Sequence, residues 1–219
     1  MTESLFGSLT VIIEPDARFA GLNMAIDQAL LELSTTPVLR VYDWDRPSVT
    51  VGYSHDLGAV EFDGPIVRRW TGGGIVWHGG DATYALIVPM TDPWALTRPL
   101  DSYREIHSAL AEQLNASGHG PCRLASEEDR KAGALCFEAP ALHDIVRGPR
   151  KIAGAGQRRN RAGLLHQGSV KARLDADFWR PFATKLAREV RMLTESSSQV
   201  LERAHDLVRT RYGTLEWSR

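Results

Sequence analysis

The sequence predicts an α+β protein in which helices pack on a mixed β-sheet. Short β-rich runs are more frequent than helical segments, and the two kinds do not alternate along the chain as they do in a βαβ protein. The chain has 219 residues, 43% of them hydrophobic and 24% charged. This length and composition are typical of a single globular domain.

The N-terminal part of the chain is expected to place one helix among several strands. Leu22, Ile26 and Leu33 follow helical spacing, and Pro37 ends this helix. The turn at residues 45–47 separates two β-rich runs, which predicts either a hairpin or successive strands of a sheet. In order, we expect a strand at 9–14, a helix that opens near Asn23, and strands at 38–42, 48–52, 66–69, 75–77 and 84–89.

The C-terminal part is expected to contain one further helix, short strands and two closing helices. Ile106, Leu110 and Leu114 follow helical spacing within residues 100–116, and Gly118 ends that helix. A serine-rich segment can cap the last helix. Strands are expected at 122–126, 143–146, 151–154 and 164–170, and helices at 177–193 and 196–212. We expect residues 1–219 to form one domain, with 177–212 as its C-terminal helices.

Composition argues against several classes of protein. The longest apolar runs fall far short of the ~18 residues that cross a membrane, and the first residues lack the pattern of a secretory signal. We therefore expect a cytoplasmic protein with no membrane partner. Cys122 and Cys136 match neither a disulfide framework nor a metal motif, so no metal site is predicted. The chain has no helix-turn-helix or zinc signature, and no nucleic-acid partner is expected.

Charge is unevenly distributed although the net charge is only −1. Residues 145–174 contain no Asp or Glu. A locally basic surface of this kind suits a phosphate group or an acidic partner protein, and the alternative is a solvated face balanced by acidic neighbours in space. The basic residues of this stretch are Arg147, Arg150, Lys151, Arg158, Arg159, Arg161, Lys171 and Arg173.

The first chemical motif is a run of three glycines between two β-rich segments. Glycines leave backbone N–H groups unobstructed and permit positive φ, so the chain can wrap a ligand closely. Two preceding arginines could neutralise a phosphate. A flexible hairpin tip is the alternative, and the motif is neither a Walker loop nor a Gly-x-Gly-x-x-Gly fingerprint. The motif reads Arg68-Arg69-Trp70-Thr71-Gly72-Gly73-Gly74-Ile75-Val76-Trp77-His78.

The second and third motifs supply a lysine and a cysteine. Lys151 begins a short strand of small residues that includes Gly154 and Ala155, which leaves room for a substrate against the backbone. Its ammonium could stabilise an oxyanion or hold a phosphate. Cys136 lies fifteen residues earlier, a distance that a strand–turn–strand could fold back. A nearby cation lowers the pKa of a thiol, so a Cys/Lys pair can transfer an acyl group through a thioester.

Four motifs in order resemble the lipoate–protein ligase and octanoyltransferase family, from about Asn23 to Val170. The family shares its cofactor-transferase fold with biotin–protein ligases, and the resemblance implies that fold here. The motifs are Asn23-Met24-Ala25-Ile26-Asp27, the segment 68–78 with its Thr-Gly-Gly-Gly centre, Asp144 ahead of Lys151-Ile152-Ala153-Gly154, and Leu165-His166-Gln167-Gly168-Ser169.

The resemblance also assigns roles to residues. In that family the glycine-rich segment wraps the acyl chain and its activated head group, and the lysine that matches Lys151 contacts the activated carbonyl or phosphate. We therefore expect Lys151 to be catalytic. The expected substrate-binding residues are Arg69, Thr71, Gly72, Gly73, Gly74, His78, Gly154, Ala155, His166 and Gly168.

Two chemistries occur in the family. Transferases pass octanoate from acyl-carrier protein through a cysteine to a lysine of a lipoyl-domain carrier, and they need no cofactor. The carrier is either the glycine cleavage H protein or a 2-oxoacid dehydrogenase E2. Ligases use ATP and Mg²⁺ to form an acyl-adenylate. Cys136 lies in a Cys-Phe-x-x-Pro setting like that of Cys-dependent octanoyltransferases, and only about fifty residues follow Val170, too few for a ligase's accessory domain. The sequence favours the transferase; the alternative is an ATP-dependent lipoate–protein ligase, or the catalytic subunit of one whose accessory domain is a separate chain.

Two other functions, a biotin–protein ligase and a non-catalytic binding module, agree less well with the sequence. A biotin–protein ligase would carry a Gly-Arg-Gly-Arg loop, which is missing. A non-catalytic binding module would not need Cys136. The chain departs from the family pattern at His78-Gly79-Gly80-Asp81 and at His143, which leaves the fine substrate choice open. Cys122 matches no family role and is expected to be structural.

Overall fold

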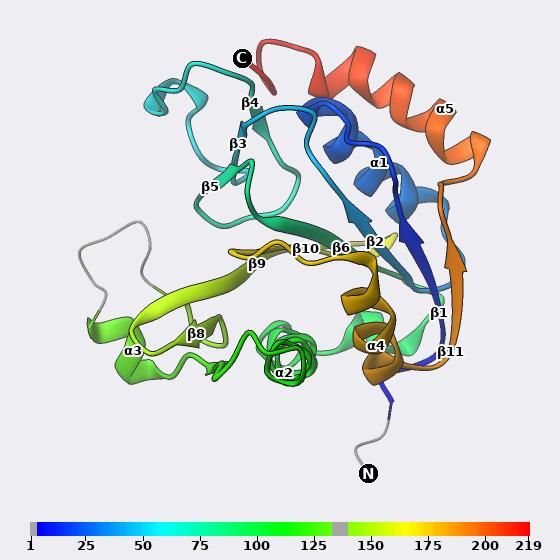
Figure 1. Cartoon of the computed structure of the whole chain (residues 1–219). Coiled ribbons are helices and arrows are strands. Elements are labelled where there is room, and N and C mark those ends of the chain that lie inside the picture. The colour runs from blue at the N-terminus through cyan, green and yellow to red at the C-terminus, as the bar shows by residue number, and fades with distance from the viewer. Residues whose placement is uncertain (1–3, 133–139) are drawn as a thin grey trace.

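The computed structural model describes residues 4–132 and 140–219, and Cys136 therefore lies outside the described residues. Within these ranges an eight-stranded mixed sheet forms the centre of the molecule, in the order β11-β1-β2-β6-β10-β9-β8-β7 (Figure 1). Strand β1 pairs in parallel with β2 and β11, and the other neighbours pair antiparallel. The strands are β1 (Phe6–Ile13), β2 (Val38–Tyr42), β6 (Ala82–Pro89), β7 (Arg123–Leu124), β8 (Ile145–Arg147), β9 (Arg150–Asn160), β10 (Gly163–Val170) and β11 (Ala187–Leu193).

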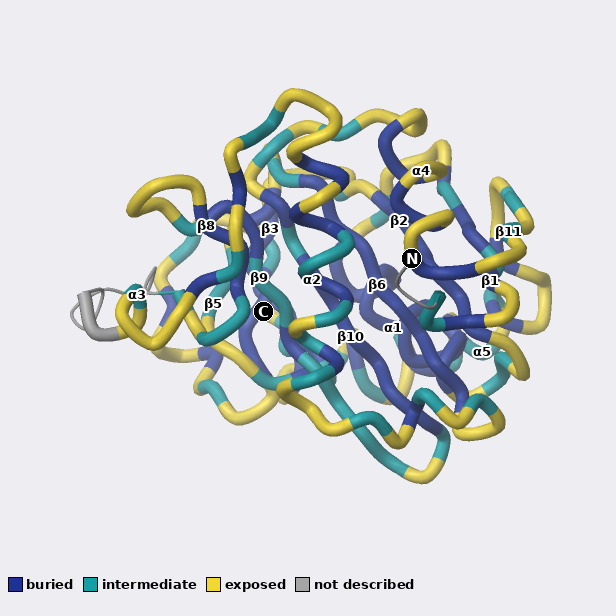
Figure 2. Tube along the Cα trace, turned by 90° about the horizontal axis from the view of Figure 1, so that it is seen from below, coloured by how far each residue is buried: buried dark blue, intermediate teal, exposed yellow. Residues whose placement is uncertain are grey.

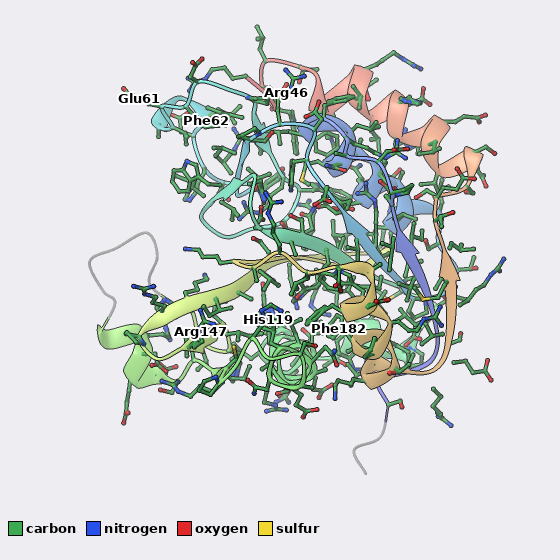
Figure 3. All side chains as sticks on the ribbon, viewed as in Figure 1. Arg46, Glu61, Phe62, His119, Arg147 and Phe182 are labelled. Carbon is green, nitrogen blue, oxygen red and sulfur yellow. The ribbon has the colours of Figure 1, made fainter. Side chains whose placement is uncertain are left out.

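A second, three-stranded sheet lies beside the first. Its order is β4 (Ile66–Arg68), β3 (Ser48–Val51) and β5 (Ile75–His78). It has a small core of its own, formed by Val49, Val51, Leu57, Val60 and Ile66. Figure 3 shows the labelled side chains of Arg46, Glu61 and Phe62 at this end of the molecule.

Helices cover both faces of the large sheet. In Figure 1, α1 (Ala20–Leu33) and α5 (Ser198–Leu207) lie on one side, and α2 (Pro99–Ala116) and α4 (Ala176–Leu186) lie on the other. The remaining helical segments are α3 (Glu127–Ala132), the short η1 (Leu57–Ala59) and η2 (Pro93–Leu96), and the π-helical η3 (Val208–Tyr212). None of the helices in the described ranges is long and apolar enough to span a bilayer.

Alternation along the strands divides the core into two layers. On β10, Leu164 packs with the α2 and α4 side chains, whereas Leu165 packs with those of α1 and α5. Successive side chains of a strand point to opposite faces, which produces this division. The central strand β6 is buried along its whole length, as the dark tube in Figure 2 shows. Neighbouring residues of one strand therefore have different surroundings, and this decides which of them reach the site.

The predicted α+β class is confirmed, one alternative for the segments 38–42 and 48–52 is excluded, and one helix prediction is wrong. The segments 38–42 and 48–52 belong to different sheets rather than to one hairpin. Residues 187–193, expected to continue a helix, form β11 along the outer side of β1. The sequence Ala187-Arg188-Glu189-Val190-Arg191-Met192-Leu193 has good helix formers, yet β1 would otherwise leave a row of backbone groups unpaired. Pairing with that edge overrides local helix propensity.

Candidate active site

A cavity of about 480 Å³ lies between the small sheet and strands β9 and β10 of the large one. Its lining comes from segments far apart in the sequence, which the two sheets bring together. The lining includes Met24, Tyr42, Trp44, Thr50, Arg69, Gly73, Gly74, Ile75, Trp77, His78, Ala141, Asp144, Lys151, Gly154, Ala155, Gln167, Gly168, Ser169 and Lys171. Of the predicted site residues, Arg69, Gly73, Gly74, His78, Lys151, Gly154, Ala155 and Gly168 lie in this lining.

The glycine segment is held by the Arg69 side chain. Its guanidinium donates to the carbonyl oxygens of Gly72 and Gly74, both at 2.8 Å, and to the carbonyl and hydroxyl of Thr50 at 3.2 Å. Burial lowers the pKa of Arg69 to about 10. Arg68 likewise donates to the carbonyl oxygens of Tyr53 and His55. Both arginines thus bind backbone carbonyls, so the expectation that they neutralise a phosphate is not supported.

This arrangement leaves amides of the glycine segment available to a ligand. The Thr71 carbonyl accepts from the amide of Tyr53, and the Gly74 carbonyl accepts from that of Gly52. Among the described residues, no protein group accepts a hydrogen bond from the amides of Gly73 and Gly74, which line the cavity. Gly73 has φ of +98°, a conformation that favours glycine. Two free N–H groups beside each other can bind an anionic oxygen.

The glycine segment also lies directly on strand β9. A Cβ at Gly156 would come within 2.4 Å of the Gly72 carbonyl oxygen, and a Cβ at Gly52 within 1.9 Å of the Gly73 carbonyl oxygen. The buried Thr71 hydroxyl donates to Gln167 at 2.7 Å. Thr71 and Gly72 are therefore not part of the lining; they fix the segment to β9 and β10.

Lys151 forms an ion pair at the cavity wall. Its Nζ lies 2.7 Å from Oδ2 of Asp144, which is buried, while the Lys151 side chain stays 27% exposed. The pair lies over the backbone of Gly154, where an added Cβ would be 2.6 Å from Cε and 2.7 Å from Nζ of the lysine. Asp144 also accepts from the amide of Ala141 at 2.7 Å. The small residue at 154 thus makes room for the pair.

His78 anchors one wall of the cavity and is neutral. Its Nδ1 lies 2.8 Å from Asp81, its Nε2 lies 3.0 Å from the Thr50 hydroxyl, and its ring stacks on Trp44. Burial lowers the pKa of His78, while hydrogen bonding to His78 and Ser169 holds the pKa of Asp81 at about 2 against the effect of burial. Because Thr50 is also bonded to Arg69, His78 and the glycine segment belong to one hydrogen-bonded network.

His166 does not line the cavity, so its prediction as a substrate-binding residue is not supported by its position. It lies on the face of β10 that α2 covers, where it contacts the hydroxyl of Tyr84 at 3.2 Å and the side-chain amide of Gln157 at 2.9 Å. The neighbouring Gln167 points to the other face, toward the cavity, and donates to Asp27 at 2.7 Å. The strand period of two places His166 and Gln167 on opposite faces.

Several lining residues were missed from the sequence. Asp144 and Gln167 lie within recognised motifs but were not assigned a site role. Met24 also lies within a recognised motif without an assigned role, whereas Tyr42 and Trp44 gave no local signal, because they reach the cavity only through the packing of β2 and the segment after it against the small sheet. Trp77 lines the cavity with 57% of its surface exposed. The periodicity of β10 shows only that His166 and Gln167 face opposite sides of the sheet.

The two cysteines differ in what can be said of them. Cys136 lies outside the described residues; Ala141, five residues later, lines the cavity. Cys122 is buried, its Sγ lies 3.3 Å from the carbonyl oxygen of His119, and burial raises the pKa of its thiol. These observations agree with a structural role for Cys122. In the parts of the chain described here, no group of three or more His, Cys, Asp or Glu side chains could hold a metal ion.

Acidification is predicted to destabilise the protein below about pH 6.5. Burial lowers the pKa values of His78, His107 and His166 from the ordinary value of 6.5, so the unfolded chain binds more protons than the folded one below that pH. The stability these groups contribute is complete above pH 6.5 and is lost as the pH falls toward their folded pKa values. Urea unfolding at pH 7.5 and 5.5 should give a smaller free energy at pH 5.5, and His166→Phe should weaken this dependence. An unchanged or larger value at pH 5.5 would contradict the prediction.

Comparison with known proteins assigns the chain to a family. Residues 20–208 match the family described as "Lipoyl protein ligase A/B catalytic domain". Octanoyltransferase LipM of Moorella thermoacetica is 37% identical over 172 residues, which are 71% of this chain and 62% of the relative. LipM of Staphylococcus aureus is 33% identical over 173 residues, 71% of this chain and 63% of the relative. The chain thus spans about three fifths of the length of these curated relatives.

Solved structures show the same fold. A lipoate-protein ligase A structure bound with ATP superposes with a TM-score of 0.69 at 19% identity, covering 97% of this chain and 98% of that one. A chain from the bi-partite lipoate protein ligase of Thermoplasma acidophilum, studied with its E2 lipoyl domain, gives 0.70 at 19% identity, covering 97% and 96%. The family match covers residues 20–208 and includes the glycine segment and the Lys151–Asp144 pair. The chain therefore belongs to the lipoyl protein ligase A/B catalytic domain family.

Proposed function

We propose that the protein is an octanoyltransferase. It moves an octanoyl or lipoyl group from an acyl-carrier protein thioester, through a thioester on Cys136, to a lysine of a lipoyl-domain carrier in the cytoplasm. The observation that carries the proposal is a cavity whose lining includes both the Lys151 side chain and the Gly73–Gly74 segment, in a chain 37% identical to an octanoyltransferase. Its volume of about 480 Å³ suits a small acyl ligand.

The residues support acyl transfer in two steps. The Cys136 thiolate attacks the carbonyl carbon of the acyl thioester, and the amides of Gly73 and Gly74 with the Lys151 ammonium stabilise the oxyanion. The oxyanion collapses, the carbon–sulfur bond to the donor breaks, and the donor thiolate leaves and takes up a proton. The carrier lysine, as the free amine, then attacks the Cys136 thioester, loses a proton and forms the amide, and the Cys136 thiolate is released.

The ligase alternative needs ATP and Mg²⁺ to activate a free acid. Binding the phosphates of ATP calls for cationic donors directed at them. Arg68 and Arg69 direct their guanidinium groups to backbone carbonyl oxygens instead. These contacts favour the transferase, whose reaction from thioester to amide is downhill and needs no cofactor.

A transfer assay separates the two chemistries. Octanoyl acyl-carrier protein and an apo lipoyl domain, either the glycine cleavage H protein or a 2-oxoacid dehydrogenase E2 domain, are mixed with the enzyme without nucleotide. We expect the lipoyl domain to gain one octanoyl mass on its lysine. If the lipoyl domain is modified only when free octanoate or lipoate and Mg-ATP are supplied, the protein is a ligase and the transferase proposal fails.

Exposed cations on and next to strands β8, β9 and β10 suit acidic carriers. Lys171 follows the last residue of β10 and lines the cavity, and its amide donates to Ile152 of β9 at 2.7 Å. Arg173 is exposed two residues after Lys171, Arg150 is exposed at the start of β9, and Arg147 pairs with Arg150 in the β8–β9 ladder. Figure 3 shows Arg147 beside His119, whose carbonyl oxygen accepts from its guanidinium. We propose that this edge receives acyl-carrier protein and the lipoyl domain.

Salt is predicted to raise the KM for a carrier protein and to leave kcat unchanged. Exposed charges are screened over about 10 Å at 0.1 M salt, so attraction between the basic edge and an acidic carrier weakens as salt increases. Initial rates between 20 and 300 mM NaCl, as chosen conditions, should show a severalfold rise in KM, and Arg150→Glu should raise KM at low salt. A small octanoyl thioester without a carrier protein should show no such change. A KM independent of salt would contradict docking at this edge.

A further inference from the structure

We propose that His107 is a positioning residue for Lys151, acting through the turn that contains His143 and Asp144. The inference rests on the proposed function only in that Lys151 is taken to contact the reacting group. His107 lies on α2, is completely buried and has no place in the lining of the cavity. Its role follows from the hydrogen bonds that join it to the Lys151–Asp144 pair.

The bond from His107 has a defined direction. Nδ1 of His107 lies 2.6 Å from the carbonyl oxygen of His143. A carbonyl oxygen only accepts, so Nδ1 must carry the proton and donate. Within the described residues Nε2 has no partner, and burial lowers the pKa of His107, so the ring is neutral with its single proton on Nδ1. The side chain therefore makes one short, directed bond, from the core to the turn.

The turn that receives this bond has an unusual backbone. His143 has φ of +68°, and it is a non-glycine residue in the left-handed region. Such a conformation costs free energy and persists only where the surrounding structure enforces it. The enforcing contacts are the His107 bond and the pairing with Ala125, whose carbonyl accepts from His143 N and whose amide donates to the Asp144 carbonyl.

The left-handed residue sets the position of the next one. Asp144 N donates to the Ala141 carbonyl at 3.0 Å, and Oδ2 accepts from the Ala141 amide at 2.7 Å. The same Oδ2 lies 2.7 Å from Nζ of Lys151. The hydrogen bond from His107 on α2 thus fixes the carbonyl of His143. By holding this turn, it also holds the Asp144 carboxylate that pairs with Lys151. Without the donor at Nδ1, the half-buried His143 carbonyl loses this partner and the turn is expected to relax.

Two amide substitutions test the geometry with little change in polarity. The side-chain nitrogen of Asn replaces Nδ1 of histidine, whereas that of Gln replaces Nε2. His107→Asn should keep the bond to His143 and His107→Gln should lose it. We expect hydrogen–deuterium exchange at the amides of Ala141, His143 and Asp144 to quicken in His107→Gln and to stay near the wild-type rate in His107→Asn.

The kcat values of the two variants should differ in the same way as their exchange rates. His107→Gln should lower kcat by about 10- to 100-fold, the scale of misplacing a catalytic group by about an ångström, with the KM for the donor carrier unchanged. His107→Asn should restore most of kcat. Leu110→Ala, one helical turn further along α2, loosens the same helix without touching this bond and should leave exchange in the turn unchanged.

The outcomes separate this inference from the proposed function. If His107→Gln does not fold, His107→Phe replaces it, since it also lacks the donor. Wild-type exchange and kcat in the donor-free variant, or equal effects in the Asn, Gln and Leu110→Ala variants, would overturn the positioning role. Failure of the wild-type protein to transfer octanoate would instead overturn the proposed function, and the exchange result would still decide whether His107 holds the turn.

Discussion

Cys136→Ala is expected to abolish octanoyl transfer from acyl-carrier protein to the lipoyl domain. Without the sulfur, the acyl group cannot leave the donor through an enzyme thioester, and direct attack by the carrier lysine would need both carriers at the site at once. The residual rate should be lower by a factor of about 10⁴ or more, comparable to removing the nucleophile of other covalent enzymes. The rate is measured from the mass of the lipoyl domain with time.

Cys122→Ala is the matched control. Cys122 is the other thiol of the chain; it is buried and its pKa is raised, so it lacks the features of a nucleophile. We expect this variant to transfer octanoate at near the wild-type rate, with some loss of stability. Transfer by Cys136→Ala at the wild-type rate would show that the acyl group does not pass through Cys136.

Gly154→Ala is expected to lower kcat by about 10²- to 10³-fold, the effect of removing one oxyanion donor. The added methyl carbon would lie 2.6 Å from Cε and 2.7 Å from Nζ of Lys151, and 2.9 Å from Oδ1 of Asp144. Carbon atoms do not approach this closely, so the ends of the Lys151 and Asp144 side chains, which form a 2.7 Å contact, must shift away from residue 154. The oxyanion would then lose the ammonium at its intended position.

Gly7→Ala serves as the control for Gly154→Ala. Gly7 also lies on a strand of the large sheet, and an added Cβ would meet nothing within 4 Å. Both variants are measured for kcat, KM and thermal unfolding. The prediction requires that only Gly154→Ala loses activity while remaining folded at the assay temperature. A Gly154→Ala variant with wild-type kcat would mean that the Lys151–Asp144 contact is not needed for transfer.

The parts of the site with a strong local signal were predictable from the sequence. The three glycines permit backbone conformations that other residues avoid, and Gly73 adopts one of them. Lys151 precedes small residues that leave space beside the backbone, and Gly154 provides that space. These features are properties of a few neighbouring residues, so sequence order alone reveals them.

The partners of charged side chains were not predictable in the same way. Arg69 lies beside the glycines in sequence, which suggested a phosphate ligand, but its donors satisfy carbonyl oxygens of the segment itself. Asp144 and Lys151 pair across the β8–β9 turn, and Gln167 meets Asp27 from 140 residues away. Such contacts depend on how the sheets and helices assemble, and no local pattern specifies them.

Strand pairing and strand phase account for the remaining differences. His166 and Gln167 are adjacent, and only the register of β10 between β6 and β9 decides which one faces the cavity. Residues 187–193 have no β signal of their own that outweighs their helix formers, and they become a strand because β1 offers a free edge. In both cases the tertiary environment decides between alternatives that the local sequence leaves open.

The most direct test is intact-protein mass spectrometry after mixing the enzyme with octanoyl acyl-carrier protein in the absence of ATP. The account predicts an octanoyl adduct that hydroxylamine removes, that Cys136→Ala prevents and that disappears when an apo lipoyl domain is added. No adduct on the wild-type protein, with the lipoyl domain acylated only from free acid and Mg-ATP, would contradict it.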